Sequence, residues 1–190
     1  MEESRWMMQK WKVLSSDYLV ENYPYHLIRH DRCQLSNGVE IDSYIEEYPN
    51  WVNAVVLTPA MEMVLVVQYR HGVKDFVIET PGGMVDAGET SLAAITREVA
   101  EETGYRSTEP PILLGEFYPN PAASSNRVST YLFLNARQEG DQHLDQNEDI
   151  EIRIVPFEAF GQMIRTGQAP QIFAAMGYHL AKDYLARHSS

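Results

Sequence analysis

Three acidic residues belong to a segment that the sequence predicts to be helical, and they span about one turn of it: Glu98, Glu101 and Glu102. At about 100° per residue, Glu98 and Glu102 fall together on one edge of such a helix, and Glu101 lies about a quarter-turn further round. Carboxylates this close repel one another. The spacing fits either a divalent-metal site, because Mg²⁺ and Mn²⁺ prefer carboxylate oxygens, or a solvated acidic helix face.

A glycine-rich loop precedes these carboxylates and favours the metal site. Residues 81–83 (Pro-Gly-Gly) and 86–88 (Asp-Ala-Gly) are turn-forming sequences. Residues 89–91 (Glu-Thr-Ser) offer a helix cap and a first-turn carboxylate. We therefore expect a helix that runs to about Thr103 and is closed by Gly104.

The elements around this helix are predicted from apolar periodicity. In the helix itself, Leu92, Ile95 and Val99 are spaced to form one buried stripe. Strands are expected at Trp11–Leu14, Tyr25–Leu35, Val39–Tyr48, Asn53–Thr58, Met63–Tyr69, Val73–Glu79, Ile112–Tyr118, Val128–Asn135 and Ile150–Val155, and two final helices at Phe157–Arg165 and Pro170–Arg187. A sheet covered by helices, of the α/β or α+β class, follows from this order.

Composition limits the class of partner. The 190 residues carry a formal net charge of −12, which argues against a nucleic-acid-binding face. Cys33 is the only cysteine, so no intrachain disulfide is possible, and we expect a buried thiol in a reducing compartment. No signal peptide and no long apolar run is evident, which predicts a soluble, cytoplasmic protein that does not bind membranes.

The stretch Gly83–Tyr105, GMVDAGETSLAAITREVAEETGY, resembles the Nudix box, G-x5-E-x7-R-E-U-x-E-E-x-G-U, where U is apolar. All seven fixed residues are present, a match expected by chance on the order of once in a hundred million starting positions. Tyr105 is the one departure, because the family more often has an aliphatic residue there. The resemblance implies the family's α/β/α sandwich, a mixed sheet flanked by helices, and hydrolysis of a nucleoside diphosphate linked to another group with Mg²⁺ or Mn²⁺.

The resemblance also assigns roles to residues of the box. The implied metal ligands are Glu98 and Glu102, with Glu101 as an additional ligand, and the backbone carbonyl of Gly82. Glu89 is implied to support the site, and Arg97 to hold the loop and the helix carboxylates in place.

Further segments resemble ADP-ribose pyrophosphatases within this family. In QYRHGVKDFVIETPGG, Arg70 matches an arginine that contacts substrate phosphates. Pro121 lies sixteen residues after the box, where that group characteristically has a proline. The following AASSNR departs from the small turn and acidic residue common there, so related nucleoside diphosphate sugars are also expected substrates.

An acidic loop before the last strand resembles the loop that supplies the catalytic base in that group. Glu148 is the residue we select as base, and Asp145, Asp149 and Glu151 are alternatives. A base on a mobile loop closes over bound substrate and orients the attacking water.

The chain is expected to divide into an N-terminal β-hairpin element, residues 1–48, and a Nudix domain, residues 49–190. By resemblance, the first element forms a homodimer and contributes aromatic residues to the substrate base. Tyr25 and Tyr44, one on each arm of the hairpin, are the candidates for stacking.

Other functions remain open at this level. The same box serves hydrolases of GDP-sugars, dinucleoside polyphosphates or oxidised nucleoside triphosphates. A non-catalytic module that binds nucleotide or RNA is the alternative of another class. Such modules usually lose box carboxylates, and none is lost here.

Overall fold

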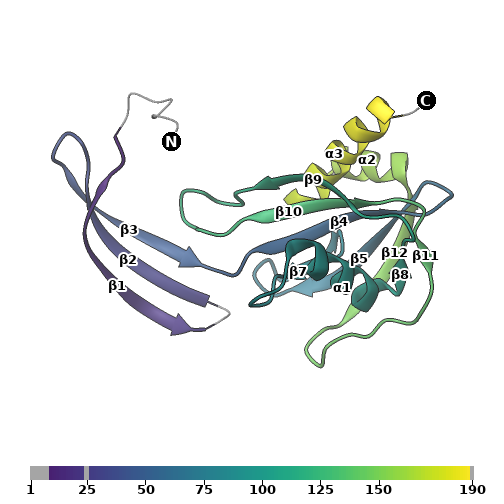
Figure 1. Cartoon of the computed structure of the whole chain (residues 1–190), viewed down its shortest axis with the longest axis horizontal. Helices are drawn as coiled ribbons and strands as arrows, with labels where there is room; N and C mark the ends of the chain where they lie inside the picture. The colour runs from purple at the N-terminus through teal and green to yellow at the C-terminus, as the bar shows by residue number, and fades with distance from the viewer. Residues whose placement is uncertain (1–8, 24–25, 189–190) are drawn as a thin grey trace. The chain divides into compact units, whose positions relative to one another are not determined.

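The computed structural model describes residues 9–23 and 26–188, which form two compact units. One unit contains the chain up to Pro49 together with Tyr118–Asn126, and the other contains Asn50–Phe117 and the chain from Arg127 onward. Figure 1 labels the elements of both. The functional division into residues 1–48 and 49–190 stays a prediction.

The first unit is a three-stranded antiparallel sheet in the order β1-β2-β3. Its strands are β1 (Lys12–Asn22), β2 (His26–Gln34) and β3 (Glu40–Glu47). The predicted turn between β2 and β3 is confirmed, because Gly38 has φ 86° and the N–H of Leu35 donates to the carbonyl of Val39 at 2.9 Å. The unit is therefore a three-stranded sheet and not only a hairpin.

The prediction of a short first strand was wrong. β1 has eleven residues and pairs with β2 over its whole length. Register shifts between Val13 and Ser15 and between Tyr18 and Val20 interrupt the pairing. Such bulges break the alternation of apolar and polar residues by which a strand is found in a sequence.

Polar contacts and one loop consolidate this unit. Asp31 is 6% exposed and accepts hydrogen bonds from Arg29 and Ser16. The loop 118–126 adds to the edge at β3, where the N–H of Glu46 donates to the carbonyl of Ala123 at 2.7 Å. Cys33 is buried, as expected.

The second unit is built on a seven-stranded mixed sheet. Its main path is β12-β5-β4-β10-β9, with β6 paired to β5 and β7 paired to β4. The strands are β4 (Trp51–Leu57), β5 (Glu62–Arg70), β6 (Asp75–Glu79), β7 (Gly82–Met84), β9 (Ile112–Phe117), β10 (Val128–Phe133) and β12 (Ile150–Pro156). β4 and β10 run parallel and the other pairs are antiparallel, so the sheet is mixed.

Helices cover both faces of this sheet, which confirms the predicted sandwich. α1 (Ser91–Thr103) lies on one face, and α2 (Phe157–Arg165) and α3 (Ile172–His188) lie on the other (Figure 1). Alternation along β4 separates two cores: Val56 packs in a cluster with α1, and Leu57 in a cluster with α2 and α3. No helix of residues 9–23 and 26–188 is long and apolar enough to cross a membrane.

α1 is capped at both ends as predicted, but the expected first-turn carboxylate is wrong, because Glu89 precedes the N-cap residue Thr90 and no acidic residue lies in the first turn. The Thr90 hydroxyl accepts from the N–H of Ala93 at 3.2 Å, and Gly104, at φ 69°, closes the helix. The predicted apolar stripe was wrong at one end, since Leu92 is 45% exposed whereas Ala94 is fully buried. The helix is rotated so that the edge bearing Glu98 and Glu102 also turns inward.

The chain after α1 makes a small separate ribbon. β8 (Tyr105–Arg106) pairs with β11 (Arg137–Gln138). Tyr105, the residue that departs from the family pattern, is 7% exposed and packs in the core with α1. An aromatic ring therefore fills the space behind the helix.

Candidate active site

Two glutamates of α1, one helical turn apart, are both buried. Glu98 is 9% exposed and Glu102 is 3% exposed. The pKa of Glu102 is raised to about 8, mainly by burial and in smaller part by the charges of Glu98 and Glu148. Burial also raises the pKa of Glu98, against the opposing effect of Arg97. Desolvated carboxylates that repel one another are a suitable environment for a divalent cation.

The glycine loop lies directly against these carboxylates. The N–H of Gly82 donates to Oε2 of Glu102 at 2.8 Å, and β7 pairs Gly82 with Asn53 of β4. A Cβ atom at Gly82 would overlap the carbonyl oxygen of Val52, and a Cβ atom at Gly83 would overlap the carboxylate of Glu98. Only glycine fits at position 82, where the obstacle is backbone, whereas a side chain at position 83 would displace the carboxylate of Glu98.

Arg97 connects the loop to the carboxylates. Its Nη1 donates to Glu98 at 2.9 Å and to Glu101 at 3.1 Å, and its Nη2 donates to Glu89 at 3.1 Å. A further bond joins Nη2 to the carbonyl of Met84 at 3.3 Å. The hydrogen bond to Glu89 and the neighbouring carboxylates raise the pKa of Arg97, and the same hydrogen bond lowers the pKa of Glu89. Arg97 is thus the hub of the loop–helix junction.

The implied metal ligands do not form a preassembled cluster. Within the described part of the chain, no three acidic, histidine or cysteine side chains are already grouped to hold a metal ion. The reason is local: Arg97 binds Glu98 and Glu101, and Gly82 binds Glu102. The donors themselves, carboxylate and carbonyl oxygens, fit Mg²⁺ or Mn²⁺, so a cation would compete with Arg97 for two of them.

Glu148 is brought to the same place by a different part of the chain. It lies in the loop between β11 and β12, half-buried, and its Oε2 accepts from the N–H of Asp145 at 3.0 Å. Its charge raises the pKa of both Glu98 and Glu102. The alternatives for the base, Asp145, Asp149 and Glu151, are all exposed.

Arg70 reaches the site from β5. Its guanidinium pairs with Glu79 of β6, with Nε 3.1 Å from both carboxylate oxygens and Nη2 2.5 Å from Oε2. The positive charge of Arg70 lowers the pKa of Glu102. Sequence reasoning missed Glu79, which is 7% exposed and also accepts from Gln68 at 3.1 Å. The available signal was a glutamate at the end of the strand predicted at Val73–Glu79, directly before the glycine-rich loop.

Of the two tyrosines predicted to stack on the substrate base, the structure describes only Tyr44. Tyr25 lies outside the described residues. Tyr44 of β3 is 57% exposed, and its ring stacks on His30 with centroids 4.9 Å apart. One face of Tyr44 is therefore covered by an aromatic neighbour, and its role in base binding stays a prediction.

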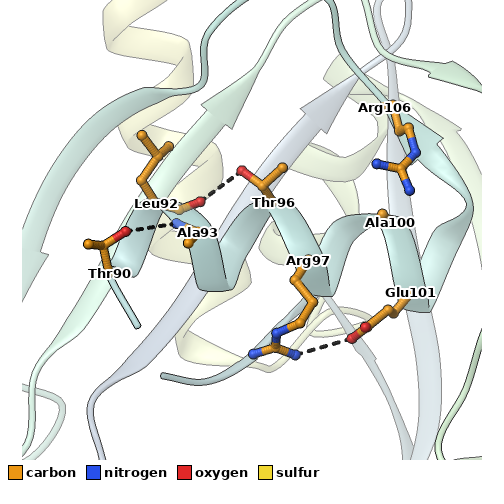
Figure 2. Close-up of a pocket in the computed structure, with 8 residues that line it drawn as sticks. All are labelled: Thr90, Leu92, Ala93, Thr96, Arg97, Ala100, Glu101 and Arg106. Carbon is orange, nitrogen blue, oxygen red and sulfur yellow. Dashed lines mark hydrogen bonds and ion pairs between the residues drawn. The ribbon is translucent and has the colours of Figure 1, made fainter. Parts of the chain in front are cut away.

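A hollow beside α1 is lined by eight residues (Figure 2): Thr90, Leu92, Ala93, Thr96, Arg97, Ala100, Glu101 and Arg106. Of the candidate site residues, Arg97 and Glu101 border it, and Figure 2 shows them paired with each other. The buried carboxylates do not line it. The hollow is therefore a surface groove of the helix and not the place where the candidate site is assembled.

Comparisons with known proteins agree with the resemblance in the box. The model of the NUDIX domain family matches residues 48–175. A GDP-mannose pyrophosphatase of Enterobacter sp. (strain 638) is 30% identical over 171 residues, covering 84% of this chain and 85% of that protein. The ADP-ribose pyrophosphatase of Bacillus subtilis (strain 168) is 28% identical over 127 residues, covering 66% and 68%. The methanol dehydrogenase activator of Bacillus methanolicus is 27% identical, covering 64% and 66%.

A solved structure described as an ADP compounds hydrolase superposes with a TM-score of 0.80 and covers 97% of both chains. Its sequence identity is 18%, so this likeness establishes the fold. The α/β sandwich expected from the box is thereby confirmed.

Proposed function

The chain belongs to the NUDIX domain family, and we propose that it hydrolyses the pyrophosphate bond of ADP-ribose or a related nucleoside diphosphate sugar. The products are a nucleoside monophosphate and a sugar phosphate. The observation that carries the proposal is the assembly of buried Glu98 and Glu102 with Glu148 and Arg70, which come from three separate elements. Such a site combines cation ligands, a base and a phosphate-binding cation.

A divalent metal ion would be held by α1 and the loop before it. Glu98 and Glu102 with the carbonyl of Gly82 would bind Mg²⁺ or Mn²⁺, and Glu101 would add a ligand. When bound, the metal shields the phosphate charges and stabilises the leaving group. Arg97 and Glu89 keep the loop against the helix.

The remaining residues act on water and phosphate. Glu148 accepts a proton from water as the water oxygen attacks one phosphorus, and the bridging P–O bond breaks. Arg70 neutralises phosphate charge, and because Glu79 fixes its guanidinium, little order is lost when substrate binds. The leaving phosphate carries away the electron pair of the broken bond.

Two sugar nucleotides are favoured by specific observations. The hypothesis that ADP-ribose is the substrate is supported by Arg70, by Pro121 and by relatives named ADP-ribose pyrophosphatase from B. subtilis and Saccharomyces cerevisiae. GDP-mannose is the second candidate, because GDP-mannose pyrophosphatases align over 84% of this chain. Dinucleoside polyphosphates and oxidised nucleoside triphosphates lack comparable support.

The N-terminal sheet is proposed as the dimer interface. All eleven residues of β1 are exposed, among them Val13 at 55%, Tyr18 at 47% and Leu19 at 57%. An exposed edge strand with large apolar side chains is an unsatisfied pairing surface. In this proposal a second copy covers it, and Tyr44 stacks on the substrate base.

A substrate panel tests the function. Product formation from ADP-ribose with Mg²⁺ is measured beside GDP-mannose, a diadenosine polyphosphate and dGTP at equal concentration. Fast release of AMP and ribose 5-phosphate, with the others slow, supports the ADP-ribose proposal. Similar rates on ADP-ribose and GDP-mannose indicate a generalist, and no turnover of any of the four contradicts the proposed function.

A further inference from the structure

The C-terminal end of α1 is capped by a separate stretch of chain, residues 139–143. Carbonyl groups in the last turn of a helix have no partner within the helix. Here the N–H of His143 donates to the carbonyl of Glu101 at 2.8 Å, and the carbonyl of Gly104 accepts from two N–H groups of the stretch at 3.0 and 3.3 Å. The helix that carries the candidate metal ligands is therefore fastened to the start of the loop that follows.

The side chain of Gln142 extends this cap to the other end of the loop. Its Nε2 donates to the carbonyl of Glu102 at 2.7 Å and to the carbonyl of Ile150 at 3.2 Å. Glu102 lies in the last turn of α1, and Ile150 is the first residue of β12. A primary amide has two N–H bonds, so one half-buried side chain serves both acceptors.

The two hydrogen bonds of Gln142 are called the tie below. The loop that they close, residues 143–149, is fully described, has no regular secondary structure and contains Glu148. We propose that Gln142 is a positioning residue: by joining the end of α1 to the start of β12, it closes the neck of this loop and keeps Glu148 facing Glu98 and Glu102. The inference rests on the proposed function, in which Glu148 is the base.

The position of the tie predicts which kinetic constant changes. Arg70 and the metal ligands lie on β5, β7 and α1. Pairing with β4 and β6 holds the two strands, and caps at Thr90 and Gly104 hold α1, so these elements keep their positions when the bonds of Gln142 are lost. Loss of the tie should therefore leave KM nearly unchanged and lower kcat. Because a misplacement of about 1 Å can reduce a rate about 100-fold, we expect kcat to fall by about 10- to 100-fold.

The experiment is a double-mutant cycle. Gln142→Ala, and Gln142→Met, which keeps the length of the side chain but has no N–H, are each made in the parent and in Glu148→Gln. Gln138→Ala is the matched control, because Gln138 is an exposed glutamine at the end of β11, just before this stretch, and its amide makes only a long 3.5 Å bond to Gly140. Thermal unfolding is recorded for every variant.

The expected result is non-additivity. Both Gln142 variants should lower kcat in the parent and change it by less than about twofold in the Glu148→Gln background, because residues that act as a unit cannot be lost twice. An equal loss in both backgrounds would overturn the proposal, since Gln142 would then act on the metal site or on folding. Full activity of Gln142→Met would also overturn it, because the hydrogen bonds would not be needed.

Amide hydrogen exchange separates this inference from the proposed function. Exchange across residues 143–149 is measured without substrate for the parent, both Gln142 variants and Gln138→Ala. Faster exchange in the Gln142 variants alone supports the tie even if no sugar nucleotide is hydrolysed. Unchanged exchange overturns the tie even if the protein proves to be an active hydrolase.

Discussion

The N–H of Gly82 donates a 2.8 Å hydrogen bond to Oε2 of Glu102, twenty residues later in the chain. This bond places the loop before α1 against a carboxylate in the last turn of the helix. Gly82, whose carbonyl is an implied metal ligand, therefore lies next to the carboxylate of Glu102, which is another implied ligand.

Glu102→Gln should lower turnover by at least about 100-fold without unfolding the protein, since an amide is a much weaker cation ligand than a carboxylate. The amide oxygen still accepts the bond from Gly82, so thermal unfolding should stay near that of the parent. Steady-state kinetics with Mg²⁺ check the change. Glu21→Gln, at an exposed position on β1, is the control. Activity of Glu102→Gln close to that of the parent would mean that the metal site is elsewhere.

Gly83→Ala should weaken activation by metal. The added Cβ would overlap the carboxylate of Glu98, which is the end of a flexible side chain and can move aside. Displacing a ligand in this way typically costs about 10- to 100-fold in metal affinity or activity. Titration of activity with Mg²⁺ measures the shift. Gly72→Ala is the control, because nothing lies within 4 Å of a Cβ there, and equal effects of the two changes would refute the explanation.

Glu79→Gln should raise KM more than it lowers kcat. Glu79 holds Arg70 through two nitrogen atoms of the guanidinium, and the neutral amide releases that charge-assisted contact. A loss of about 1.4 kcal/mol in binding corresponds to about a tenfold rise in KM. Glu40→Gln, which breaks the exposed pair with Arg32, should leave KM unchanged. A change confined to kcat would contradict the role of Glu79 in holding Arg70.

Asp31→Asn should destabilise the sheet β1–β3 at neutral pH. The hydrogen bond from Arg29 lowers the pKa of Asp31, so the folded protein favours its ionised form. The unfolded pKa is about 3.9, and the stabilisation is therefore complete above that value and is lost as the pH falls through the lower folded pKa. The variant should lose about 1–3 kcal/mol at pH 7 and differ less from the parent near pH 3. Urea unfolding at both pH values, with Asp17→Asn on β1 as control, tests this; a gap that widens in acid would refute it.

Leu19→Lys should convert the proposed dimer into a monomer. Leu19 is 57% exposed on β1, and a charge there would have to be buried if a second copy covers the strand. Sedimentation of the parent should give twice the chain mass of 21.7 kDa. Ile172→Lys, at a position 68% exposed on α3, should leave the dimer intact. A monomeric parent would exclude the interface.

The sequence by itself determined the family, the position of α1 and the residues of the box. These follow from local chemistry: Thr90 and Gly104 cap the helix through their own backbone neighbours, and the box residues are close in the chain. The helix Phe157–Arg165 was also predicted with its observed bounds. β1 was predicted too short, because its register shifts remove the alternation that a sequence shows.

Only the tertiary structure decided which side chains share one site. The register of β5 and β6 sets Asp75 opposite Arg70, yet the guanidinium of Arg70 binds Glu79 further along β6. Leu92 is exposed because the packing of Ala94 rotates α1. Gln142 reaches both Glu102 and Ile150 because the loop after β11 returns to the end of the helix. Contacts between residues far apart in the chain depend on register and packing, which no local pattern of residues contains.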